Sequence, residues 1–141
     1  MNVLQLSGTT KLAGDQDAAY LQILNQKSYW AAAIKNFLQA YMKGKNFAPV
    51  GTVGQGHWRL LAQINKSGDE ILVLDSSGEQ VKWVDIDEIA EKFVHYYNFG
   101  NEIIVGFDML IFKENEEGSN MTINSLDDFI KEQKDIINKI G

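Results

Sequence analysis

The sequence predicts an α+β fold, in which helices pack against a small antiparallel sheet. Apolar residues recur at helical spacing in residues 28–44 and again near the C-terminus. Residues 57–84 instead contain short apolar runs separated by turn-forming residues. Helices therefore precede and follow the strands, with one helix crossing between them, which is the order typical of α+β proteins.

Length and composition bound the possible functions. The chain has 141 residues, 45% of them hydrophobic, so we expect residues 1–141 to form a single domain. The net charge is −6 and the basic residues are scattered, which argues against a nucleic-acid partner. We find neither a membrane span of about 18 apolar residues nor a signal peptide. We therefore expect a soluble protein, either cytoplasmic or delivered into a target cell.

The chain contains no cysteine and only two histidines. The missing cysteines exclude disulfides and thiolate ligands, and two histidines far apart in sequence do not suggest a zinc site. We therefore expect no metal and no other cofactor.

The N-terminal part predicts a short strand and two helices. Asn2–Leu6 is expected to be the strand, and Asp15 or Asp17 is a plausible N-cap for a short first helix. Ser28 is expected to cap a second helix that ends at Gly44, where a C-terminal glycine stop belongs.

The middle of the chain predicts an antiparallel hairpin with a third strand. Residues 47–53 are expected to be extended. Residues 57–65 and 70–75 are the hairpin strands, joined by the turn-forming residues 66–69, and residues 80–84 follow as the third strand. In the first hairpin strand, alternation puts His57, Arg59, Leu61 and Gln63 on the more polar face. Ile71–Leu74 is apolar throughout, which predicts a central strand covered on both faces.

The C-terminal part predicts a helix, a strand and a closing helix. Asp85 or Asp87 can cap the first helix, near whose end we expect a partly buried or capping His95. Residues 102–112 form a long apolar strand, and residues 114–120 an exposed acidic turn. Ser125, with Asp128 three residues on, predicts the start of the final helix.

The hairpin suggests chemistry at one of its ends. His57 begins one strand and Asp75 ends the next, and neighbouring antiparallel strands lie about 5 Å apart. A carboxylate can therefore orient the imidazole, as in a nucleophilic triad. Gln80, beyond the next turn, can donate its amide to a developing oxyanion or cap the turn.

The stretch LQAYMKGKNFAPVGTVGQGHWRLLAQINKSGDEILVLDSSGEQVKWVDIDEIAEKF resembles the C-terminal half of papain-like cysteine peptidases that process bacteriocin leaders. Its diagnostic features are the Gly56-His57 pair and the Leu74-Asp75 strand end. The resemblance implies a papain-like α+β fold in which His57 is general base and acid and Asp75 orients it.

Such families carry the cysteine at the start of an earlier helix, where the helix dipole lowers the thiol pKa. The stretch GDQDAAYLQIL is similar to one family signature and puts the nucleophile around Ala18, with Gln16 or Asp17 as close alternatives. Gln16 is also a candidate oxyanion donor, beside Gln80. The stretch NQKSYWAAAI is similar to another and puts the nucleophile at Ala31, with Gln26 as the donor. Ala18 is preferred because Ala31 leaves a short segment before His57.

The resemblance implies a cysteine-type hydrolase acting on an amide of a protein or peptide. The spacing from Ala18 to His57 and on to Gln80 also resembles bacterial papain-fold toxins that deamidate glutamine, so peptidase and deamidase both stay open. Because both candidate positions hold alanine, either the cysteine was substituted or a natural relative has lost it. The alternative function is a catalytically inactive papain-like protein, or an acidic binding protein such as an immunity protein or inhibitor.

Overall fold

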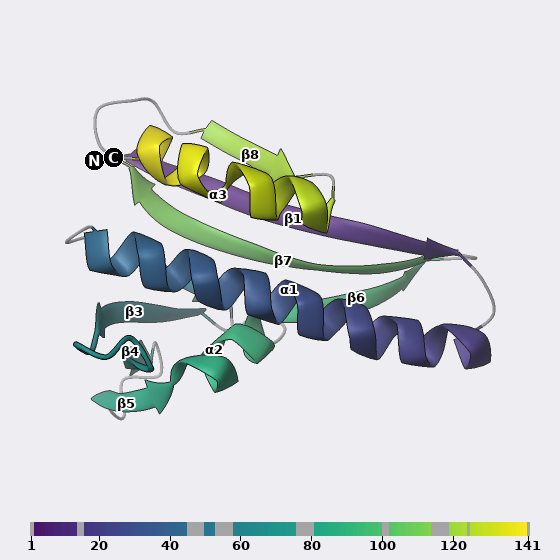
Figure 1. The fold of residues 1–141 in the computed structure, drawn as a ribbon, viewed down its shortest axis with the longest axis horizontal. Coiled ribbons are helices and arrows are strands. Elements are labelled where there is room, and N and C mark those ends of the chain that lie inside the picture. The colour runs from purple at the N-terminus through teal and green to yellow at the C-terminus, as the bar shows by residue number, and fades with distance from the viewer. Residues whose placement is uncertain are drawn as a thin grey trace.

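The computed structural model describes residues 2–13, 16–44, 50–52, 58–75, 81–99, 102–113, 119–123 and 125–140 (Figure 1). In chain order the elements are β1 (Asn2–Ala13), α1 (Gln16–Gly44), β2 (Val50–Thr52), β3 (Trp58–Ile64), β4 (Glu70–Asp75), β5 (Val81–Asp85), α2 (Ile86–Phe93), β6 (Val94–Phe99), β7 (Glu102–Lys113), β8 (Ser119–Ile123) and α3 (Leu126–Ile140). The predicted α+β class is confirmed.

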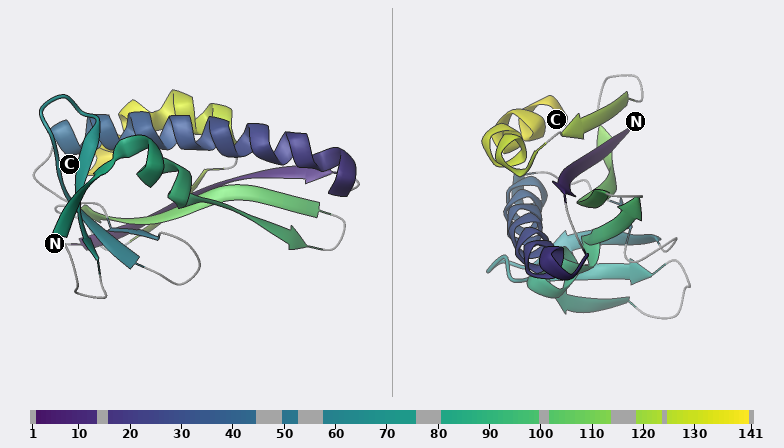
Figure 2. Two further views of the ribbon diagram at one scale, coloured as in Figure 1. Left: turned by 90° about the horizontal axis from the view of Figure 1, so that it is seen from below. Right: turned by 90° about the vertical axis from the view of Figure 1, so that its right-hand side faces the viewer.

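Within these residues, the strands form one eight-stranded sheet, in which seven strands follow the order β5-β4-β3-β2-β7-β1-β8 and β6 also pairs with β7. The long strand β7 pairs with β1 along its whole length, while β6 and β2 share its other side. Strands β1 and β8 run parallel and the other pairs are antiparallel, so the sheet is mixed and not purely antiparallel as predicted. Helices α1 and α3 lie side by side on one face (Figures 1 and 2).

The core lies between α1 and the sheet. Every second residue of β7 from Val105 to Ile111 is buried, which gives the strand one apolar face. Four rings fill the centre: Trp30 and Phe37 from α1, Phe107 from β7 and Phe129 from α3, with neighbouring centroids 5.1–5.8 Å apart. Since buried aromatic side chains dominate core energetics, this cluster fixes both helices on the sheet.

Helix α1 is continuous, so the predicted break at Ser28 is wrong. Residues 16–43 contain no proline or glycine, and an exposed serine inside a helix is tolerated at small cost. The buried stripe of α1 then runs on from Trp30 to Met42. The predicted end at Gly44 is confirmed.

Three strands differ from the prediction. β1 does not stop at Leu6 but runs to Ala13, because β7 supplies a pairing partner for its polar half. α2 ends at Phe93, so His95 lies in β6 and not at a helix end. β8 takes up part of the predicted acidic turn, whose residues 114–118 lie outside the described residues.

A β-bulge changes the alternation within β3, so the predicted faces hold at Ile64, which packs against the core, but not at Leu61. Its pairing with β4 shifts register between Leu61 and Gln63. Leu61 is fully buried and Gln63 is exposed, so the face shared by Arg59 and Leu61 is the inward one. Among residues 70–74 of β4, whose burial the structure describes, Ile71 and Val73 are buried and Leu72 and Leu74 are half-buried, so the prediction of a strand covered on both faces is also wrong.

The starts of α2 and α3 follow their predicted caps, whereas at α1 the candidate Asp17 lies inside the helix and Asp15 lies outside the described residues. The Asp85 carboxylate accepts a hydrogen bond from the backbone N–H of Asp87 (2.8 Å) at the start of α2. The Ser125 hydroxyl accepts one from the N–H of Asp128 (3.1 Å) at the start of α3. No helix in the described part of the chain is long and apolar enough to cross a bilayer.

Candidate functional site at the β3–β4 hairpin and the α1–α2 groove

The β3–β4 turn is held by its own side chains. The side-chain oxygen of Asn65 accepts hydrogen bonds from the backbone N–H groups of Gly68, Asp69 and Glu70, each at 3.0 Å. Gly68 has φ +80°, the left-handed region that favours glycine. Hydrogen bonds from Ser67 (2.7 Å) and Asn65 (2.6 Å) lower the pKa of the Asp69 carboxyl. The predicted hairpin is therefore confirmed, with a rigid turn.

At the other end of the hairpin, Asp75 is the last residue of β4 and pairs with Arg59 of β3. Arg59 in turn pairs with Gly51 of β2, and Gly51 with the fully buried Met109 of β7. Residues paired across strands share a sheet face, so the Asp75 position belongs to the row that faces the helices. This row is where a helix-borne nucleophile would have to meet the hairpin.

Of the predicted site residues, His57 and Gln80 lie outside the described residues, and their roles remain predictions. Gln16 is the first residue of α1 and Ala18 lies in its first turn. That end of α1 points away from β3, β4 and β5 (Figure 1). The structure therefore does not bring Ala18 beside Asp75.

Ala31 lies near the middle of α1, next to Trp30, whose ring contacts Phe107. It is 9% exposed and has helix on both sides, so no helix N-terminus is available at this position. Gln26, five residues earlier, has a buried Oε1 without a hydrogen-bond partner in the described part of the chain. Buried polar atoms are rarely left unpaired, so this amide calls for an explanation.

Ala31 also lines a groove between α1 and α2. The groove has a volume of about 390 Å³. Its lining residues are Ser28, Ala31, Ala32, Lys35, Asn36, Asp87, Ala90 and Glu91. No histidine is among them, so the groove carries polar and charged groups but not the imidazole that the predicted triad needs.

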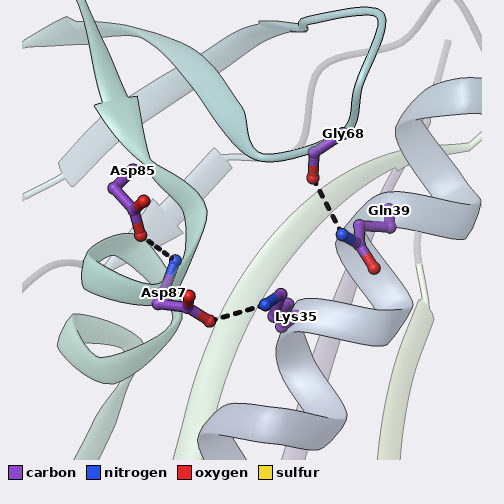
Figure 3. Close-up of polar contacts among 5 residues, drawn as sticks. All are labelled: Lys35, Gln39, Gly68, Asp85 and Asp87. Atoms are coloured by element: carbon purple, nitrogen blue, oxygen red, sulfur yellow. Dashed lines mark hydrogen bonds and ion pairs between the residues drawn. The ribbon is translucent and has the colours of Figure 1, made fainter.

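Two contacts attach this region to α1 (Figure 3). The Lys35 ammonium lies 2.9 Å from the Asp87 carboxylate, and this contact raises the pKa of Lys35. Further along α1, the Gln39 side-chain amide donates to the Gly68 carbonyl oxygen (2.8 Å). Helix α2 and the hairpin turn are therefore both held against the C-terminal half of α1, far from Ala18.

Among the described residues, no group of three or more His, Asp or Glu side chains is arranged to hold a metal ion. His95 is partly buried in β6. Burial lowers the pKa of His95, against the opposing effects of Asp108 and of a backbone hydrogen bond to Phe93. Comparison with protein-family models, curated proteins and solved structures gave no significant match to this chain.

Proposed function

We propose that this chain is a papain-like domain for cysteine-type attack on an amide, in which alanine occupies the position of the nucleophile. Since the chain has no cysteine, it binds its protein or peptide substrate without hydrolysing it. The observation that carries this proposal is the β3–β4 hairpin, whose last residue, Asp75, lies in the row that faces the helices.

The proposed roles set a condition on the hairpin. His57 acts as general base and acid, and Asp75 accepts a hydrogen bond from its imidazole. This requires that residue 57 share the sheet face of Arg59, as residues two apart on a strand do. Gln80 or Gln16 donates to the oxyanion.

The two nucleophile positions have different support. For Ala18 it is the first turn of α1, where the helix dipole would lower the pKa of a thiol. For Ala31 it is the resemblance alone, which gives Gln26 as the oxyanion donor through its side-chain N–H; the unpaired buried atom of Gln26 within the described residues is Oε1, an acceptor, and does not add to this support. Ala18 is the first choice for its helix start, although α1 carries it away from the hairpin (Figure 1).

Restoring the cysteine tests the proposal. Ala18→Cys and Ala31→Cys are made separately, each with and without His57→Gln. Ala40→Cys, at an exposed position of the same helix, is the matched control. Thiol pKa is measured from the pH dependence of alkylation by iodoacetamide, followed by mass spectrometry.

At the correct position the thiol pKa falls below the ordinary value of about 8.5, and His57→Gln raises it again. The Ala40→Cys thiol keeps its ordinary pKa. If both restored thiols have the same pKa as the control thiol, and His57→Gln does not change that pKa, the proposal is wrong. If instead one restored thiol has a lowered pKa, that variant is assayed for peptide-bond cleavage and for ammonia release from glutamine peptides. These two products distinguish a peptidase from a deamidase, which share an acyl-thioester intermediate.

A second candidate is an acidic binding protein, such as an immunity protein or inhibitor that masks a basic toxin. It is favoured by the net charge of −6 and by exposed carboxylates on two helices. These are Asp87, Glu88 and Glu91 on α2, and Asp127, Asp128, Glu132 and Asp135 on α3. Binding to a basic protein that weakens steeply with salt, with ordinary thiol pKa values in both cysteine variants, would favour this candidate.

A further inference from the structure

Strand β5 forms one edge of the sheet. It pairs with β4, and no other strand of the described chain lies on its outer side. Two large apolar side chains of this short strand are exposed, Val81 at 64% and Trp83 at 45%. They share a face with Leu72 and Leu74 of β4, which are only partly buried. An exposed apolar edge is the kind of surface to which another strand can add.

The register shows which backbone groups of β5 face away from β4. The Ile86 N–H donates to the Asp69 carbonyl oxygen (2.9 Å), which makes these two a hydrogen-bonded pair that continues the β4–β5 register. Bonded and non-bonded pairs alternate along an antiparallel ladder. Lys82 and Val84 are therefore bonded to β4, and the N–H and C=O groups of Val81 and Trp83 point outward.

We infer that the outer edge of β5 binds an extended peptide segment of a protein partner as an additional strand. The outward backbone groups of Val81 and Trp83 supply its hydrogen bonds, and their side chains take apolar residues beside them. Lys82 lies on the opposite face, is exposed and has no ion pair within the described chain. The partner residue beside Lys82 is therefore acidic, so the segment reads apolar-acidic-apolar.

A second copy of this chain does not meet these requirements. Residues paired across strands share a face, so a symmetric antiparallel pairing of two β5 strands joins positions of the same parity. If such a pairing is centred on residue 82, Lys82 lies opposite Lys82 of the other copy, which places like charges side by side. If it is centred on residue 83, Lys82 lies opposite Val84, which supplies no carboxylate. The occupant is thus a foreign segment, and this site uses no residue of the proposed function.

Binding of two short peptides tests the inference. The probes are acetyl-Thr-Val-Glu-Val-Thr-amide and its counterpart with lysine in place of glutamate, titrated into the full chain by calorimetry. The variants are Lys82→Glu and Val81→Pro, with Lys131→Glu on the exposed surface of α3 as the charge-matched control. Proline at position 81, the first residue of β5, removes an outward N–H and leaves the bonds to β4 intact.

We expect saturable binding of the glutamate peptide, with the lysine peptide about tenfold weaker. Lys82→Glu reverses this order and Lys131→Glu leaves it unchanged. Val81→Pro abolishes binding with an unchanged melting temperature. Should this variant unfold, Trp83→Thr, which keeps β-propensity and loses the ring, must weaken binding instead.

Three results would each overturn the inference. The first is that neither peptide binds the folded chain. The second is that peptide affinity is unchanged by Lys82→Glu and by the edge variants. The third is that sedimentation shows a dimer that Val81→Pro dissociates, which would make a second copy the occupant.

Discussion

The side-chain amide of Gln39 donates a hydrogen bond to the carbonyl oxygen of Gly68, with a nitrogen-to-oxygen distance of 2.8 Å (Figure 3). This bond joins α1 to a turn that is far away in sequence. The turn is also fixed locally, because the Asn65 side chain accepts three backbone N–H groups from it. The hairpin is thus oriented against the helix layer by a contact separate from those that form the turn.

Removing the Gln39 contact should loosen that orientation. Gln39→Ala is expected to lower the free energy of unfolding by about 1 kcal/mol, because the Gly68 carbonyl loses its donor. Urea denaturation measures the loss, and faster amide hydrogen exchange in residues 66–70 locates it. Gln63→Ala, on an exposed side chain of β3, should change stability by less than about 0.5 kcal/mol. Equal effects of the two substitutions would contradict the assigned role of Gln39.

The closest approach of β1 and β7 gives a test of their register. A Cβ at Gly106 would collide with the backbone carbonyl oxygen of Gly8, and a backbone group in a paired strand cannot move aside. Gly106→Ala is therefore expected to cost about 3 kcal/mol or more in urea denaturation. Gly8→Ala meets side chains of Trp30 and Phe107 instead and should cost less. A Gly106→Ala protein as stable as the parent would show that the register is wrong.

Tyr41 should make the protein sensitive to alkali. Burial raises the pKa of the Tyr41 hydroxyl from 10.0 to about 12. Because the pKa is higher in the folded state, the unfolded state loses its proton first, and stability falls as pH rises from about 10 to about 12. Thermal melts across this range should show the fall, and Tyr41→Phe should reduce it. Absorbance titration near 295 nm should find a late-ionising tyrosine that Tyr41→Phe removes.

His95 should make the free energy of unfolding depend on pH in the acidic range. Its pKa lies below 6.5 in the folded state, mainly because burial disfavours the imidazolium. Between the folded value and 6.5 the unfolded state binds more protons, so stability falls as pH drops below 6.5 and is fully present above it. The unfolding free energy of the parent should therefore decrease from pH 7.5 to 5.5. His95→Gln should flatten this dependence, and an unchanged slope would argue against a depressed pKa.

Local patterns predicted much of the fold. The hairpin, the caps at Asp85 and Ser125 and the end of α1 at Gly44 depend on neighbouring residues, and the structure has them where the sequence indicates. Long-range pairing was not predictable in this way. The polar half of β1 is a strand because β7 lies beside it, and nothing within residues 7–13 shows that partner.

The candidate site was less accessible to sequence reasoning. One bulge after Leu61 interrupts the alternation of β3, so that Leu61 and Ile64 both face inward, and periodicity alone does not reveal a bulge. The continuity of α1 likewise separates Ala18 from the hairpin, although each residue was assigned to a plausible local structure. Lys82 and Trp83 were expected in a strand, but only the strand order makes that strand an edge.

The position of β1 has a consequence for biosynthesis. β1 precedes the other described strands in the chain and lies between β7 and β8, and Asn2 pairs with Lys113. During translation β1 and the apolar stripe of α1 must therefore remain unpaired until most of the chain has been made. Such late closure of distant contacts slows folding and leaves nascent chains prone to aggregation. Stalled or C-terminally truncated chains should thus be natural clients of chaperones, whereas the β3–β4 hairpin can form as soon as it emerges.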